Sequence, residues 1–131
     1  MTTKRLIGLF TSPTLIGILI LTLLWMLFFW RLLTPNATDR VVFPEGDFTQ
    51  HYYAFSEYQV KRLAEGEFPL WNPFNHSGDA FAANIQFVAF YPPRLIAAAL
   101  VGADWSLEDY QMEVAVHYWL ASLMMFAFLR V

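Results

Sequence analysis

The sequence predicts an all-α membrane protein, in which two transmembrane helices are joined by a long extracytoplasmic loop with short amphipathic helices. Hydrophobic residues make up 57% of the 131 residues and charged residues only 15%, against about 25% in an average soluble domain. Aromatic residues reach 18%, as is typical of chains that lie at membrane surfaces. The acidic residues all lie between Asp39 and Glu113, so the polar part of the chain falls between two apolar ends.

The first predicted transmembrane helix covers residues 15–33 and follows a cytoplasmic N-terminus, residues 1–14. It reads LIGILILTLLWMLFFWRLL, and a helix of this length measures about 28 Å, close to the thickness of the bilayer hydrocarbon. A cleaved signal peptide is the alternative, because Lys4 and Arg5 precede the apolar stretch. The stretch is longer than a signal-peptide core and no A-x-A cleavage site follows it, which favours an uncleaved helix.

The second predicted transmembrane helix covers residues 107–131. Ser106 is expected to cap it, with Glu108 and Asp109 in the first turn. The apolar run from Val114 reaches the end of the sequence without a cap or a tail. This pattern indicates a fragment of a larger polytopic fold, with the second helix truncated.

The connection between them, residues 34–106, is expected to hold helices near 47–64 and 93–101. Gly66 is a suitable residue just past the end of the first of these. Pro93 suits the first turn of the second, and Gly102 is expected to end it.

The first loop helix places several polar residues on one face. At 100° per residue, Asp47, Gln50, His51, Ala54 and Tyr58 share this face. Asp47 is then either a simple helix cap or a functional carboxylate, and a histidine there is more often packed than catalytic. Glu45 and Asp47 could share a divalent cation, although two carboxylates are weak support for a metal site whose metal is unknown.

The following stretch, residues 64–81, is rich in both aromatic residues and turn formers. The aromatic side chains either anchor the loop to lipid headgroups or shape a pocket. No basic run is present and the net charge is −3, so nucleic acid is not an expected partner. The absence of cysteine excludes disulfides and thiolate metal sites.

As a set, the polar and turn residues of this region resemble a known family. The matching elements are Asp47-x-x-Gln50, Gly66-x-x-Pro69-Leu70-Trp71-Asn72-Pro73, Gly78, Gln86 and Tyr91-Pro92. They are similar to the N-terminal part of the bacterial YfhO-like membrane proteins, which belong with the GT-C class of glycosyltransferases. The resemblance extends over nearly the whole chain. It departs from the family after Gly78, where Asp79-Ala80 stands in place of a nearby proline.

The resemblance implies a polytopic enzyme of the bacterial cytoplasmic membrane that moves a sugar from a polyprenyl-phosphate carrier to an extracytoplasmic acceptor. Asp47 would be the catalytic base that takes the proton of the acceptor hydroxyl. The partners would be the lipid bilayer and the lipid-linked sugar, and the fragment alone would be inactive. The remaining roles would be support of the carboxylate (Glu45, Gln50, His51), phosphate binding (Lys61, Arg62, Arg94) and formation of a loop pocket (Trp71, Asn72, Gln86, Tyr91).

Two other hypotheses stay open. The chain could belong to a non-enzymatic assembly or transport component with the same scaffold, or it could be a small two-helix protein that is complete as it stands.

Overall fold

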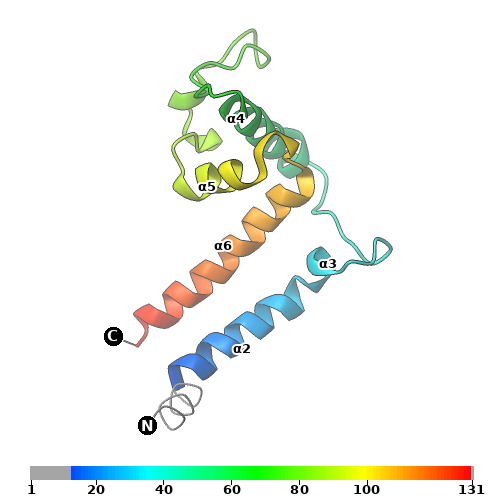
Figure 1. Ribbon diagram of the computed structural model, residues 1–131, viewed down its shortest axis with the longest axis vertical. Helices are drawn as coiled ribbons and strands as arrows, with labels where there is room; N and C mark the ends of the chain where they lie inside the picture. The colour runs from blue at the N-terminus through cyan, green and yellow to red at the C-terminus, as the bar shows by residue number, and fades with distance from the viewer. Residues whose placement is uncertain (1–12, 131) are drawn as a thin grey trace. The chain divides into compact units, whose positions relative to one another are not determined.

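The computed structural model describes residues 13–130, which are mostly helical. They fall into two compact units. The first takes the residues up to Val41 and those from Val114 onward, and the second is Val42–Glu113. Helix α6 (Leu107–Phe128) contributes residues to both (Figure 1). The predicted cytoplasmic segment, 1–14, lies outside the described residues apart from its last two positions.

The apolar segment predicted as one transmembrane helix over 15–33 is two helices in the structure. Helix α2 (Pro13–Phe28) has 16 residues, and the four-residue α3 (Trp30–Leu33) follows it. Phe29 separates them because its backbone leaves the helical region, with φ −96° and ψ 16°. At 1.5 Å per residue, α2 is about 24 Å long, which is shorter than the bilayer hydrocarbon.

The second predicted transmembrane helix corresponds to α6. This helix has 22 residues, but Glu108, Asp109 and Glu113 lie in its first two turns. Among residues 13–130, no helix combines the length and the apolar character needed to cross a membrane. The prediction of a fold with two transmembrane helices is therefore wrong, as is the multi-pass localisation in the bacterial cytoplasmic membrane that followed from it.

In the first unit, α2 lies alongside the C-terminal part of α6 with the chain running in the opposite direction (Figure 1). The Trp25 indole N–H donates to the Ala115 carbonyl at 2.7 Å, and the Trp119 indole N–H donates to the Thr22 hydroxyl at 3.1 Å. Gly17 permits a close approach, because a Cβ at this position would lie 2.4 Å from the Phe126 ring. The two helices are thus joined by a few specific contacts along their length.

The second unit is built from short helices joined by ordered loops. In chain order these are the π-helix η1 (Phe48–Tyr53), α4 (Ala54–Ala64), the 3₁₀ turns η2 (Phe81–Ala83) and η3 (Ile85–Phe87), α5 (Pro92–Val101), the 3₁₀ turn η4 (Gly102–Asp104) and the start of α6. Local sequence sets several boundaries. Prolines open α5 and Gly102 (φ 71°) follows it. The predicted cap at Ser106 is confirmed, because the Asp109 N–H donates to its hydroxyl oxygen at 3.2 Å.

The core of the second unit is aromatic. Phe55 and Phe87 stack with their ring centroids 3.9 Å apart, and Phe81 stacks on Phe87 at 4.8 Å. A second buried group surrounds Arg94, which pairs with Glu113 and lies over the rings of Trp105 and Tyr110. Packing of these two groups against α4 fixes the helix that carries the candidate site.

Candidate functional site: a groove on the second unit

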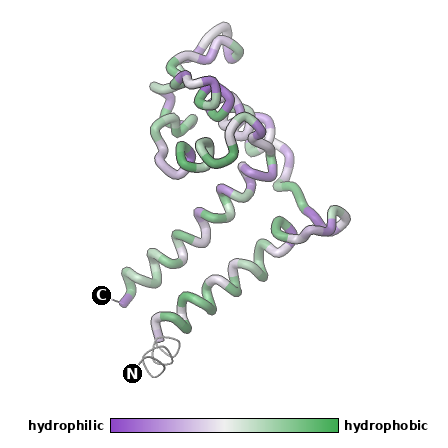
Figure 2. The backbone as a smooth tube through the Cα atoms, viewed as in Figure 1, coloured by the Kyte–Doolittle hydropathy of each residue, from purple (hydrophilic) through white to green (hydrophobic). Residues whose placement is uncertain are grey.

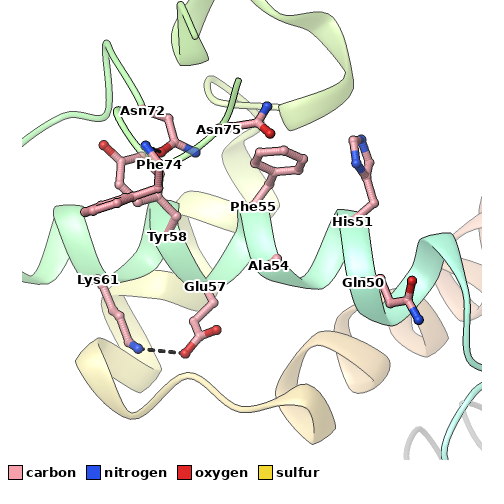
Figure 3. Close-up of a pocket in the computed structure, with 10 residues that line it drawn as sticks. All are labelled: Gln50, His51, Ala54, Phe55, Glu57, Tyr58, Lys61, Asn72, Phe74 and Asn75. Carbon is pink, nitrogen blue, oxygen red and sulfur yellow. Dashed lines mark hydrogen bonds and ion pairs between the residues drawn. The ribbon is translucent and has the colours of Figure 1, made fainter. Parts of the chain in front are cut away.

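An open groove of about 390 Å³ runs along one side of α4, within the size range of about 300–1,000 Å³ found for small-molecule sites. Its lining residues come from the helix η1–α4 and from the loop that follows (Figure 3). The helical wall of the groove consists of Gln50, His51, Ala54, Phe55, Glu57, Tyr58 and Lys61, and the loop wall consists of Asn72, Phe74 and Asn75.

The helical wall starts in the π-helical segment. Gln50 and His51 lie within η1, and α4 follows η1 without a break. Short π-helical segments occur frequently at functional sites, where they change which side chains share a face. His51 lies half-buried with its ring edge-on to Phe55, at 4.6 Å between centroids. Ala54, which also lines the groove, adds only a small side chain to this wall.

The loop wall is held in place by hydrogen bonds. Asn72 and Asp79 form an isolated antiparallel bridge, and the buried Asn72 side chain accepts from the Phe74 N–H at 2.9 Å. The Tyr58 hydroxyl donates to the Trp71 carbonyl at 2.6 Å and so joins the helix to the loop. Phe74 is held at the groove in this way although it is 86% exposed. A large, exposed aromatic ring is therefore available to a ligand.

The charges at the groove are balanced. Lys61 pairs with Glu57 at 2.6 Å, one helical turn apart (Figure 3). The hydrogen bond to Glu57 raises the pKa of Lys61 above its usual 10.5, so this amine stays protonated. The remaining lining groups are His51, Ala54, amides and aromatic rings. The groove can therefore offer both donors and acceptors to a ligand, beside aromatic surface and without a large net charge.

The structure brings four of the predicted site residues together at the groove: Gln50, His51, Lys61 and Asn72. Asp47 and Glu45 are exposed and do not line it. A π-turn spaces hydrogen-bonded residues five apart instead of four, so Asp47 does not keep the face that a regular helix would give it. Asp47 stands at the N-cap position of η1, as the cap interpretation expects, but its backbone is helical and its carboxylate makes no capping hydrogen bond.

The three cations predicted to bind phosphate each contact a carboxylate. Lys61 pairs with Glu57 as described, and Arg62 pairs with Glu65 and Glu67 at the end of α4. The Arg94 side chain is buried against Glu113, with 6% of it exposed. Only Lys61 of the three lines the groove.

The residues predicted to form a loop pocket are spread over the second unit. Asn72 lines the groove, while the Trp71 ring lies against Gly78, whose φ is +119°. A Cβ on Gly78 would lie 2.3 Å from that ring, so the glycine permits the contact. Gln86 is exposed in η3, and Tyr91 is exposed immediately before α5.

Sequence reasoning missed Phe55, Glu57 and Asn75 as members of the site, and it named Phe74 only among the loop aromatics that either anchor to lipid or shape a pocket. The helical period could have found Glu57, because residues 50, 54, 57 and 61 recur at helical spacing. No sequence pattern indicated that the loop would turn back onto this face. As for a metal, residues 13–130 contain no group of three or more His, Asp or Glu side chains placed to hold one.

Comparison of the chain with protein families, with curated proteins and with solved structures returned no match.

Proposed function

We propose that the groove of the second unit binds a saccharide, and that the chain is part of a glycosyltransferase. The observation that carries the proposal is the combination of aromatic rings, of which Phe74 is largely exposed, with amide side chains at one groove. A sugar ring has an apolar face of C–H groups and a rim of hydroxyls. Phe74 and Tyr58 offer surface to the face, and Asn75, Gln50 and His51 offer donors and acceptors to the rim.

The balanced charge favours a neutral sugar over a polyanion. Glu57 and Lys61 neutralise each other. The groove therefore has no excess positive charge with which to bind a phosphate. A polyprenyl-phosphate donor would place its sugar in the groove and its phosphate elsewhere.

Asp47 is the proposed base for transfer. It stands at the start of the helix whose next turn carries Gln50 and His51, and it makes no capping bond that would occupy the carboxylate. It would accept the proton of the acceptor hydroxyl as that oxygen bonds to the anomeric carbon. The bond from this carbon to the phosphate oxygen breaks in the same displacement, and the polyprenyl phosphate leaves with the electron pair.

The binding step is tested by titrating the chain with glucose, galactose, mannose and N-acetylglucosamine, using calorimetry. Phe74→Ala should weaken binding of the preferred sugar roughly fivefold to tenfold, because an aromatic contact contributes about 1 kcal/mol. Phe90→Ala is the matched control, since Phe90 is also exposed (67%) but lies outside the groove. Equal effects of the two substitutions, or no binding of any sugar, would contradict the proposal.

The transfer step is tested separately, in an assay of sugar transfer from a polyprenyl-phosphate-linked donor. Asp47→Asn should abolish sugar transfer and leave sugar binding intact, while Glu45→Gln should leave both intact. Normal turnover in the Asp47→Asn variant would remove the catalytic role. A binding protein without transferase activity would then be favoured.

A further inference from the structure

The outer surface of the first unit is apolar to an unusual degree, and α2 and the C-terminal part of α6 consist mostly of hydrophobic residues (Figure 2). None of the side chains of α2 is buried, and eight of its large hydrophobic residues are exposed, among them Leu27 (70%) and Phe28 (79%). The others are Ile16, Leu19, Ile20, Leu23, Leu24 and Met26. The C-terminal part of α6 adds Tyr118, Met124, Met125, Phe128 and Leu129. Contiguous apolar surface on this scale marks an interaction site in soluble proteins.

The polar groups of the same helices are turned toward each other. The Thr22 hydroxyl accepts from Trp119 and donates to the Ile18 carbonyl of its own helix, and Trp25 donates to the Ala115 carbonyl. At the other end, Arg130 donates to the Thr14 hydroxyl. A helix pair in water has the opposite arrangement, with the polar residues outside and the apolar residues between the helices.

The exposed apolar arc is wider than a single partner helix would cover. At 100° per residue, the eight exposed positions of α2 spread over about 200° of its circumference, whereas the apolar stripe of a helix that packs on one partner is about 100° wide. A surface that surrounds the helix pair suits a fluid apolar medium better than one docked protein.

The charges agree with a lipid as this medium. The charged residues in the described part of the first unit are Arg31, Asp39, Arg40 and Arg130, and all lie outside α2 and α6. Three of the four are arginines, which complement anionic headgroups. The aliphatic stem of an arginine can also extend along apolar surface while its guanidinium reaches the headgroups.

We propose that the exposed surfaces of α2 and the C-terminal part of α6 contact lipid acyl chains, with the flanking arginines at the headgroups. The proposal concerns contact with lipid and not passage through a bilayer. It does not depend on the sugar-binding role of the second unit.

Site-directed spin labelling gives a direct test, because the sequence contains no cysteine. One label is introduced by Leu27→Cys on α2, and a matched label by Leu70→Cys on the second unit, where Leu70 is 66% exposed. In phosphatidylcholine vesicles, the label at position 27 should collide more with oxygen than with a water-soluble nickel chelate. The label at position 70 should show the reverse. Preferential collision of the label at 27 with the nickel chelate would overturn the proposal.

Flotation with vesicles provides a second, independent test. The unmodified chain should float with phosphatidylcholine vesicles, and more completely when phosphatidylglycerol is added. The double substitution Leu23→Lys with Leu27→Lys should abolish flotation with phosphatidylcholine, and Leu70→Lys should not. Circular dichroism checks that the helices are retained. Binding to phosphatidylglycerol vesicles alone, or assembly into a defined oligomer that does not float, would also overturn the proposal.

Discussion

The two units of this chain use aromatic side chains in different ways. In the second unit, Phe55, Phe81 and Phe87 stack in a buried core, and the polar residues around them shape a groove. In the first unit, Trp25 and Trp119 join two helices through their indole N–H groups, while large apolar side chains face outward. Aromatic and apolar residues therefore form a buried core in the second unit and an exposed surface in the first, and the burial of the individual residues distinguishes the two cases.

A high content of hydrophobic residues does not by itself determine whether these residues form a buried core or an exposed surface. The same sequence features that predicted a membrane protein also supply the core of a small helical unit. Substitutions of buried and of exposed side chains should accordingly have different consequences, for stability in the first case and for surface interactions in the second.

The largest effect is expected in the core of the second unit. Phe81 has no exposed surface and packs against Phe55, Tyr58 and Phe87. Phe81→Ala should lower the free energy of unfolding by about 4 kcal/mol, through lost burial and the cavity left behind. Chemical denaturation of the full chain, followed by tryptophan fluorescence, measures this. Phe74→Ala is the control, because an exposed ring should change stability by no more than about 0.5 kcal/mol.

The buried ion pair should give the next largest effect. Arg94→Ala leaves the Glu113 carboxylate without this partner in a buried position, which should cost about 3 kcal/mol. Arg62→Ala, at an exposed pair, should cost about 1 kcal/mol or less. If the two substitutions cost the same in denaturation experiments, the buried group around Arg94 does not organise the second unit.

A smaller effect is expected between the helices of the first unit. Thr22→Val keeps the shape of the side chain but removes the acceptor of the Trp119 indole N–H. The loss should be about 1 kcal/mol, which is typical of one hydrogen bond. Thermal unfolding measured by circular dichroism should show it, and an unchanged midpoint would mean that other contacts hold the helices together.

The smallest effect is a dependence on alkaline pH. Burial raises the pKa of Tyr110 above 10.0, and Glu113 adds to this, while Arg94 opposes it. The folded state therefore holds the phenol proton more tightly than the unfolded state. The stabilisation is fully present below pH 10 and is lost as the pH rises through the raised pKa. Tyr110→Phe should lose less stability than the unmodified chain above pH 10, and parallel denaturation curves would contradict this.

The features that sequence reasoning predicted correctly are set by local chemistry. Ser106 caps α6, and Gly66, with φ 80°, follows the end of α4. Each depends on the conformational preference of one residue and its immediate neighbours.

The features that it missed depend on contacts between distant residues. Arg94 pairs with a residue 19 positions away, and Tyr58 bonds to a loop carbonyl 13 positions away. The break at Phe29 and the π-helical turn at His51 have no signature in the helical period, which assumes a regular helix. The groove could therefore be predicted only in part, from its helical wall.

The measurement that tests the central claim most directly is a map of backbone amide chemical shifts during titration of the isotope-labelled chain with a neutral sugar. We expect the perturbed residues to be those of the groove, above all His51, Phe74 and Asn75. Ala54→Trp should abolish the perturbation by filling the space between the two walls, without removing any polar group. Perturbation elsewhere in the second unit, or perturbation that persists in the Ala54→Trp variant, would contradict the assignment of the groove as a saccharide site.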